Sequence, residues 1–312
     1  MNRHPPGNPG ATSGFPVGGV NRRSPRGGRL GVDRMRRGQS LNRCELFDLP
    51  VIGDRITEKH PNAMRFYFEN FNGIRSGPYG SDKGKYFGKL MEALEVDCFG
   101  AAETNLQWNM SKSSPHKILS LQVGDRTAYA CNKHEVTTVK QQGGTCLTMT
   151  AKYGQYVKDT GVDPTGLGRW SWLRVKGNND IVTTVIAAYS PCKPRKDSLL
   201  SSYAQQTRHW SMQGIKMCAK KKCRADLLDF IKERKQEGEN IILMIDGNEN
   251  MVIGKMAMAL KEEPFNMTDP IRAKVGPSRF PTWFRGQDQI DAIWISEGLK
   301  ASKITYLPFF SV

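Results

Sequence analysis

The sequence has no apolar run approaching the ~18 to 20 residues that a membrane-spanning helix needs. Its first residues also lack the continuous apolar core of a secretory signal peptide. Cysteine is sparse, and the seven cysteines are odd in number and irregularly spaced, which indicates reduced thiols rather than a disulfide framework. We therefore expect a soluble intracellular protein with no membrane partner.

Patterns of zinc ligands are missing as well. Cys218 and Cys223 have four residues between them, but no second pair of cysteines or histidines lies nearby. Structural zinc sites need four such ligands arranged around the ion. This spacing therefore argues against a zinc site.

Acidic residues are too few to balance the basic ones. The chain has 46 Lys plus Arg against 30 Asp plus Glu, which gives a formal net charge of +16. Nine Arg and one Asp fall in residues 1–44, so this short segment holds half of the net charge. An excess of this kind attracts polyanions, which here means nucleic acid or an anionic membrane surface.

The chain divides into two regions by composition. Residues 1–60 are rich in Gly, Pro, Arg and Ser and contain few apolar groups to offset the entropy of ordering. We predict a disordered basic arm over 1–60 and one folded domain over 61–312. The arm could bind nucleic acid electrostatically, direct nuclear import, or be a solvated tail without a specific role.

The spacing of apolar residues predicts a domain of strands with interspersed helices, of the α/β or α+β class. The predicted strands are Met64–Phe68, Asp97–Ala102, Thr127–Cys131, Gly144–Thr150, Trp170–Val175, Ile181–Ala188, Ile241–Ile245, Gln289–Ile295 and Ser302–Leu307. The predicted helices lie around Tyr86–Leu94, along Ser198–Glu237 and over Lys255–Glu262.

Polar residues stand where several of these strands stop, or inside one of them. They are Asn72, Glu103, Tyr189, Asp246, Asn248 and Asp291. Ligand-binding groups collect where strands end along one edge of a sheet. Carboxylate, amide and phenol groups suit Mg²⁺ or Mn²⁺, and together they provide the chemistry of phosphate-ester hydrolysis.

Each of these residues also has an ordinary interpretation. Asn72 and Asp246 each precede a glycine, as in many turns. Glu103 could be a surface carboxylate or a helix cap, and Tyr189 could serve packing. Asp291 is the hardest to explain in this way, because an ionised group inside an apolar strand needs a partner.

In their order along the chain these segments resemble the endonuclease/exonuclease/phosphatase superfamily, of the exonuclease III-like kind. The matching segments are Asn72 in NFNGI, Glu103 in AAETNLQW, Gly143-Gly144-Thr145, Tyr189 in AAYSPC, Asp246 and Asn248 in MIDGNEN, Thr282-Trp283, and Asp291 in QIDAIWIS. The resemblance covers Met64–Val312, and the YSPC and ILMIDGNEN segments are most similar to endonuclease domains of retrotransposon-type elements.

The resemblance implies a four-layered, DNase I-like α/β sandwich, in which two packed mixed β-sheets are flanked by helices and the site lies at one end. It also implies roles for the residues. Glu103 would ligate the metal, and Asn72 would lie close to metal and phosphate. Tyr189 and Asn248 would stabilise the phosphoryl oxygens. Asp246 would act on the nucleophilic water or the leaving group, and Asp291 would orient a histidine.

The chain departs from the family pattern at two places. Ile245 and Gly247 flank Asp246, where the family has Gly before the aspartate and an aromatic or small residue after it. The closing Ser-Asp-His segment is not found, since no histidine follows His209. We therefore expect a fragment or a degenerate copy of the domain, with weak or no nicking activity.

Basic residues near the predicted site favour a nucleic-acid partner. Those that could contact a phosphate backbone are Lys193, Arg195, Lys196, Lys220, Lys221 and Lys222; the alternative is a solvated face. We expect an Mg²⁺-dependent DNA endonuclease of retroelement type. The alternatives are an inactive nucleic-acid-binding remnant of the fold, or a phosphatase acting on a small or lipid phosphoester, for which a basic body would be unnecessary.

Overall fold

The computed structural model describes residues 47–73, 82–106, 126–130, 141–194, 198–283 and 285–307. All of them belong to the unit Ser40–Val312. Among these residues, no helix has both the length and the apolar character required to cross a bilayer.

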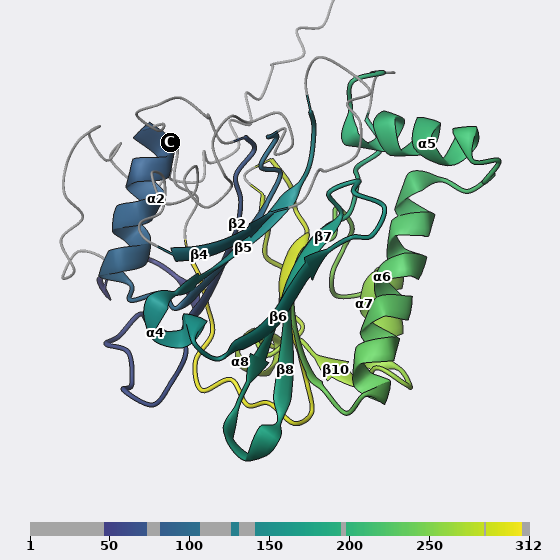
Figure 1. Cartoon of the computed structure of the whole chain (residues 1–312). Helices are drawn as coiled ribbons and strands as arrows, with labels where there is room; N and C mark the ends of the chain where they lie inside the picture. Colours follow the sequence, from purple (N-terminus) through teal and green to yellow (C-terminus); the bar gives the residue numbers. More distant parts are fainter. Residues whose placement is uncertain are drawn as a thin grey trace, which may run out of the picture. The chain divides into compact units, whose positions relative to one another are not determined.

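A six-stranded sheet forms one half of the domain (Figure 1). Its strands, in spatial order, are β10 (Met267–Thr268), β11 (Asp291–Ser296), β9 (Asn240–Asp246), β8 (Val182–Tyr189), β7 (Trp170–Lys176) and β6 (Val157–Val162). Only β8 and β9 run parallel, and the other neighbours are antiparallel. The sheet is therefore mixed.

A four-stranded sheet forms the other half. Its strands, in spatial order, are β2 (Phe66–Asn70), β3 (Cys98–Ala102), β5 (Thr145–Thr150) and β4 (Arg126–Ala130). The pair β2–β3 is parallel and the rest are antiparallel. A separate two-stranded pair joins β1 (Ile52–Gly53) to β12 (Thr305–Tyr306).

The two sheets pack face to face, and β9 shows why its sequence is a continuous apolar run. Leu243 and Ile245 belong to the core between the six-stranded sheet and its helices, whereas Ile242 and Met244 belong to the core between the sheets. A strand buried on both faces cannot alternate apolar and polar residues. The same reasoning applies to β3, whose five residues are all buried.

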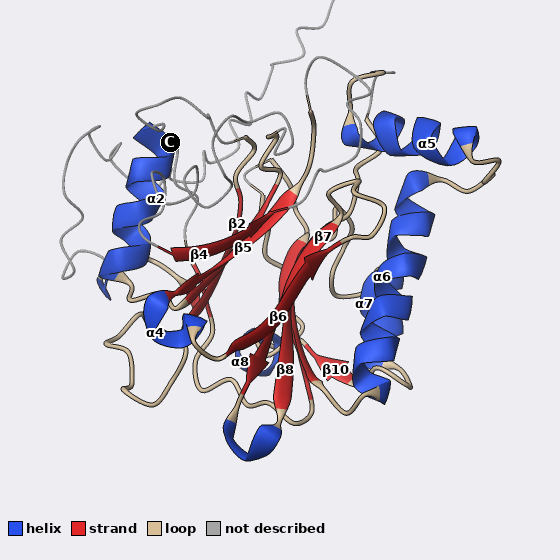
Figure 2. Ribbon diagram, in the orientation of Figure 1, coloured by secondary structure: helices blue, strands red, loops and turns tan. Residues whose placement is uncertain are grey.

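Helices cover the outer face of each sheet (Figure 2). The helices and helical turns are α2 (Asp82–Ala93), α4 (Ala151–Gly154), η1 (Asn178–Asp180), α5 (Ser202–Met212), α6 (Ala219–Gln236), α7 (Lys255–Lys261) and α8 (Arg272–Val275). Helix α2 packs on the four-stranded sheet, and α6 and α7 pack on the six-stranded one. These layers confirm the predicted four-layered α/β sandwich.

We predicted one long helical stretch along Ser198–Glu237, and this prediction is wrong in one respect, because the structure has two helices there, α5 and α6. Gly214 has a φ of 74°, in the left-handed region that ends α-helices. The N–H of Ile215 donates to the carbonyl of Trp210 at 2.9 Å, as is typical of such an end. The chain therefore turns at Gly214, and α6 begins at Ala219.

The segment 47–60, which we placed in the arm from composition, contains structure that contacts the domain. Strand β1 pairs with β12, and the N–H of Asp54 donates to the carbonyl of Ile304 at 2.9 Å. Lys59 forms an ion pair with Asp97 at 2.7 Å. Composition alone did not indicate these contacts, because the pairing partners lie far away in the sequence.

Candidate active site

The topology brings several strand ends to one place, at the upper end of the sheets in Figure 1. Strands β8 and β9 are parallel, and their last residues, Tyr189 and Asp246, are paired in register. Strand β11 runs the opposite way and begins there, with Asp291 opposite Asp246. Asp291 therefore opens its strand, rather than lying inside it as predicted.

Asp246 is the centre of this arrangement and links the two sheets. Its side chain is buried, and its Oδ2 accepts a hydrogen bond from Nδ2 of Asn70, at the end of β2, at 2.7 Å. Its Oδ1 accepts from the backbone N–H of Asn248 at 3.0 Å. Two donors thus hold both oxygens of the carboxylate in fixed positions.

The asparagine that reaches into the site is Asn70, and the sequence analysis selected its neighbour Asn72 instead. Asn72 is exposed, and its backbone N–H donates to Oδ1 of Asn70 at 2.8 Å. Asn72 has a φ of 46°, so it occupies the turn beyond the strand. The signal that could have identified Asn70 is its place as the last residue of the strand, where a side chain still faces the other sheet.

This pair of asparagines supplies a matched test. We expect Asn70→Ala to slow any hydrolysis at this site about 10- to 100-fold, because it removes a charge-assisted hydrogen bond of about 1.5–3 kcal/mol from Asp246. Asn72→Ala keeps the backbone N–H and should change the rate less than about threefold. Single-turnover rates of both variants check this expectation, and equal losses would contradict it.

Asn248 follows Asp246 in a loop that is held from two sides. Its Nδ2 donates to the carbonyl of Ser190 at 2.9 Å, and its own carbonyl accepts from Nζ of Lys220 at 2.6 Å. Its φ of 46° lies in the left-handed region, which asparagine tolerates better than most residues. Lys220 therefore fixes the backbone of the site loop.

Tyr189 places a buried phenol next to the carboxylates. Its hydroxyl lies 3.2 Å from Oγ of Ser202, the first residue of α5. Burial raises the pKa of Tyr189 well above 10, and the negative charges of Glu103 and Asp246 raise it further. The phenol therefore stays protonated and can donate a hydrogen bond.

Glu103 follows β3 and is half-buried, with a φ of 50°. Its carbonyl accepts from the N–H of Gly73 at 2.7 Å, so the ends of β2 and β3 are tied together beyond the sheet. Gly143, which belongs to a segment matched by sequence, supports the neighbouring Tyr189. A Cβ at Gly143 would lie 3.2 Å from Cβ of Ser202 and 3.2 Å from the Tyr189 ring.

An ionic cluster anchors the helices behind Tyr189. The buried guanidinium of Arg169 pairs with Asp163 at 2.6 Å and with Asp226 of α6 at 2.6 Å. It also lies over the ring of Trp210 on α5, 5.3 Å from the centroid. The carbonyl of Arg169 accepts from the N–H of Tyr189 at 2.8 Å, so α5, α6 and the site strand share one support.

Negative charge concentrates where these residues meet. Burial and the nearby carboxylate of Glu103 raise the pKa of Asp246 to about 7, although the Asn248 N–H and the Asn70 amide lower it. Burial and the charge of Asp246 raise the pKa of Asp291 well above 3.8. Like charges in a buried place favour a protonated carboxyl or a bound cation.

Asp291 carries an unused acceptor. Its backbone N–H and that of Ile290 both donate to Oγ1 of Thr282 at 2.9 Å. Its buried Oδ1 has no hydrogen-bond partner among the residues that the structure describes. Neither described histidine approaches it, since His60 lines a cavity elsewhere and His209 contacts Gln213 at 3.0 Å on α5.

The donor set fits a magnesium-type ion better than zinc. Within the described ranges, no three His, Cys, Asp or Glu side chains are grouped as metal ligands. Mg²⁺ commonly takes only one or two carboxylates and completes its shell with water and substrate oxygens. Glu103, with the amides of Asn70 and Asn248 nearby, meets that requirement.

The predicted nucleic-acid-binding residues have different surroundings. Lys193 is exposed beyond Tyr189, and Lys221 is exposed on α6. Lys220 is directed to the Asn248 loop, and Lys222 pairs with Asp226 at 2.5 Å. Arg195 and Lys196 lie outside the described residues.

No protein-family model and no curated protein matches the chain. Solved structures do match. The catalytic domain of Xenopus laevis APE2 has 14% sequence identity and a TM-score of 0.52, over 76% of this chain and 83% of that one. The human Nocturnin catalytic domain has 11% identity and a TM-score of 0.50, over 74% and 82%. The chain therefore has the endonuclease/exonuclease/phosphatase fold, as the order of its motifs predicted.

Proposed function

We propose that this chain is a divalent-metal-dependent phosphodiester hydrolase that nicks DNA, of the kind found in retroelements. The observation that carries the proposal is the carboxylate of Asp246. It is buried, held at both oxygens by Asn70 and Asn248, and surrounded by Glu103, Tyr189 and Asp291 at the strand ends of both sheets.

Each residue would have a defined task. Glu103 would hold Mg²⁺ or Mn²⁺, which supplies charge neutralisation at the phosphoryl oxygen when bound. Asp246 would accept a proton from the attacking water, since it is a buried carboxylate at the strand ends with both oxygens held in place by hydrogen bonds. The protonated phenol of Tyr189 and the amide of Asn248 would donate to the phosphoryl oxygens as negative charge builds up.

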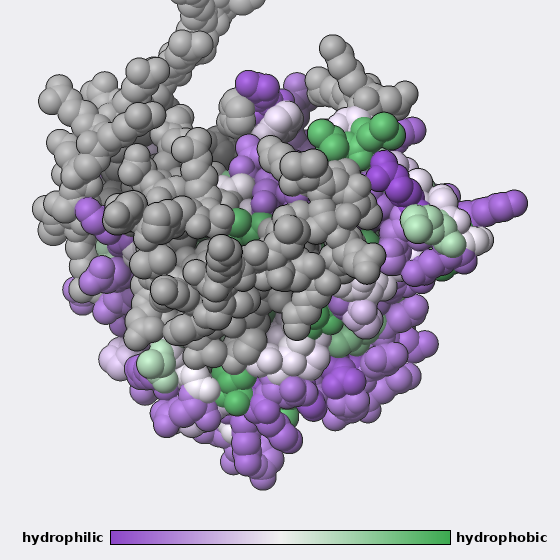
Figure 3. Space-filling view, turned by 45° about the horizontal axis from the view of Figure 1, so that its top comes forward, coloured by the Kyte–Doolittle hydropathy of each residue, from purple (hydrophilic) through white to green (hydrophobic). Residues whose placement is uncertain are grey.

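The charge of the chain favours DNA over a small phosphoester. A formal net charge of +16 increases the local concentration of a polyanion, which a small-molecule phosphatase does not need. Lys193, exposed beyond the Tyr189 strand end, could contact the phosphate backbone. On the face in Figure 3, most described residues are hydrophilic and hydrophobic ones form small separate patches, as suits a polar, wet interface.

Supercoiled plasmid with Mg²⁺ or Mn²⁺ tests the proposal. We expect slow, metal-dependent conversion to the nicked circle, and we expect Glu103→Gln to slow it further, at least about 100-fold, because the amide loses the charge that holds the ion. Glu92→Gln, on the exposed surface of α2, is the matched control and should nick at the parent rate. Robust nicking by the Glu103 variant would defeat the assignment.

One observation favours a second function. The unpartnered Oδ1 of Asp291 and the distance of both described histidines suit a domain that binds nucleic acid without cutting it. In that case a gel shift would show salt-dependent DNA binding, while no metal would support nicking. Hydrolysis of a small phosphoester without DNA binding would instead favour a phosphatase.

A further inference from the structure

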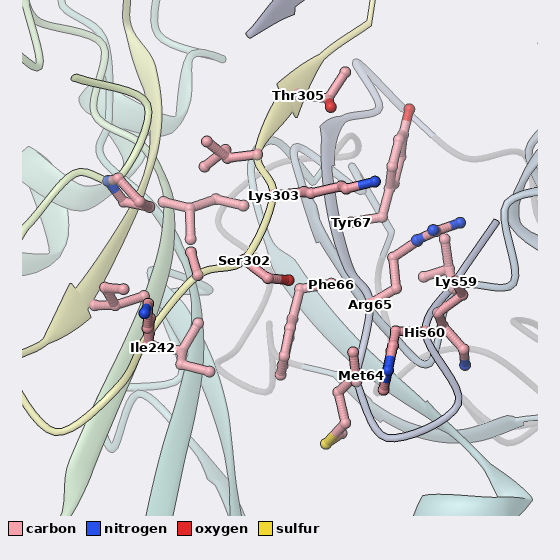
Figure 4. Close-up of a pocket in the computed structure, with 18 of the residues that line it drawn as sticks. Lys59, His60, Met64, Arg65, Phe66, Tyr67, Ile242, Ser302, Lys303 and Thr305 are labelled. Atoms are coloured by element: carbon pink, nitrogen blue, oxygen red, sulfur yellow. The ribbon is translucent and has the colours of Figure 1, made fainter. Parts of the chain in front are cut away.

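A large cavity lies between the two sheets, and Figure 4 shows residues that line it. Its volume is about 930 Å³, which is within the range of small-molecule binding sites. Its walls include Phe66, Thr183 and Ile242, at or near the starts of β2, β8 and β9. The candidate catalytic residues lie at the opposite ends of these same strands.

The cavity and the active site are well separated along β8, although they come closer along β11, where Ile293 lines the cavity two residues from Asp291. Thr183 lines the cavity and Tyr189 lies in the active site, six residues along the same strand. At about 3.3 Å per residue, this separation is roughly 20 Å. A ligand near Thr183 therefore lies outside the active site.

The inner walls are apolar and come from both sheets. Val185, Ile242 and Ile295 face inward from the six-stranded sheet, where they belong to the core between the sheets. Phe66 from β2 is only partly buried, and so is Ile293 from β11. These side chains keep accessible apolar surface that a ligand with an apolar body would cover.

Besides these apolar walls, the cavity is lined by basic side chains. They are Arg55, Lys59, Arg65, Lys300 and Lys303, against the single carboxylate of Glu58. The charge of Lys59 is balanced by Asp97 at 2.7 Å, and the guanidinium of Arg65 donates to the carbonyls of Leu94 and Thr57. The positive charge left for a ligand is that of the exposed side chains Arg55, Lys300 and Lys303. Figure 4 shows Phe66, Ile242 and Ser302 together, with Lys59, His60 and Arg65 grouped to one side.

We infer that this cavity binds an amphiphile with one alkyl chain and an anionic head, of the long-chain carboxylate class. The alkyl chain would cover the apolar walls, and the carboxylate would lie near Lys300 and Lys303, which line the cavity on the segment that leads into β12. Both lysines are exposed, and Nζ of Lys303 also donates to Oγ1 of Thr57 at 2.5 Å. The Arg-rich segment 1–44, with nine Arg and one Asp, has the wrong charge for this place.

Isothermal titration with dodecanoate tests the inference. We expect one molecule to bind per chain. Dodecan-1-ol should bind about tenfold more weakly because it has no charge to pair with the lysines, and dodecyltrimethylammonium should not bind measurably. Equal binding of all three amphiphiles, or no binding of dodecanoate, would overturn the proposal.

Variants locate the site. Ala301→Trp fills part of the cavity and should abolish dodecanoate binding, and the double change Lys300→Glu with Lys303→Glu should weaken it at least about tenfold. Lys255→Glu, exposed on α7, is the matched control and should bind as the parent does. Circular dichroism verifies folding, and plasmid nicking should be unchanged in all three variants. Unaltered dodecanoate binding by the folded cavity variants would also refute the assignment.

Discussion

Replacing Asp246 by Asn should lower the rate of Mg²⁺-dependent plasmid nicking by about 10³-fold or more, with DNA affinity retained. An amide has nearly the same size as the carboxylate but cannot accept the proton of the attacking water. General-base catalysis typically contributes about 10²–10⁴-fold, and Asp246 also supplies negative charge next to the ion that Glu103 would hold. The combined loss should therefore lie at or above the middle of this range.

The measurement is a single-turnover time course of nicking, together with a DNA-binding titration at fixed salt. Asp229→Asn, at an exposed position of α6, is the matched control, because it makes the same chemical change away from the strand ends. A parent-like rate in the Asp246 variant would remove the general base from the mechanism. A lost rate together with lost DNA binding would assign Asp246 to binding instead.

The elements that could be predicted from sequence are those in which one local pattern dominates. The apolar run Ile241–Ile245 was predicted as a strand, and β9 extends it by one residue at each end, to Asn240 and Asp246. Strand β6 could not be predicted in this way. Its sequence VKDTGV is largely polar, and its pairing with β7 depends on contacts that no local pattern records.

The candidate site shows a similar division. Motif order predicted that Glu103, Tyr189, Asp246 and Asp291 would converge, and the strand register places the last three next to one another. The choice between Asn70 and Asn72 depends on where β2 ends. We predicted that strand as Met64–Phe68, whereas β2 continues to Asn70 and Asn72 lies in the turn beyond it.

The buried carboxylates should also make the metal-free domain less stable as the pH rises. Asp246 has a pKa of about 7 in the folded state and about 3.8 when unfolded, so between these values the folded state holds a proton that the unfolded state has released. Raising the pH therefore favours unfolding, and the free energy of unfolding should fall between pH 4 and pH 7. Asp291 acts in the same direction, since its pKa is also raised.

The variant that isolates this effect is Asp291→Asn. The amide removes a buried charge that lies close to Asp246 and whose Oδ1 has no partner among the described residues. In the presence of a chelator at pH 8, we expect the free energy of unfolding of this variant to be at least about 1 kcal/mol higher than that of the parent. Its midpoint temperature of unfolding should be about 2–4 °C higher.

Thermal unfolding in chelator at pH 5 and pH 8 checks this expectation. The advantage of the Asn variant should shrink at pH 5, where the parent carboxyl of Asp246 is protonated and no longer repels the charge of Asp291. Saturating Mg²⁺ should stabilise the parent more than the variant at pH 8, because a bound cation offsets the same repulsion. A variant less stable than the parent at pH 8 would mean that Asp291 is paired in the folded protein, and its carboxylate would then be a structural support rather than part of a cation site.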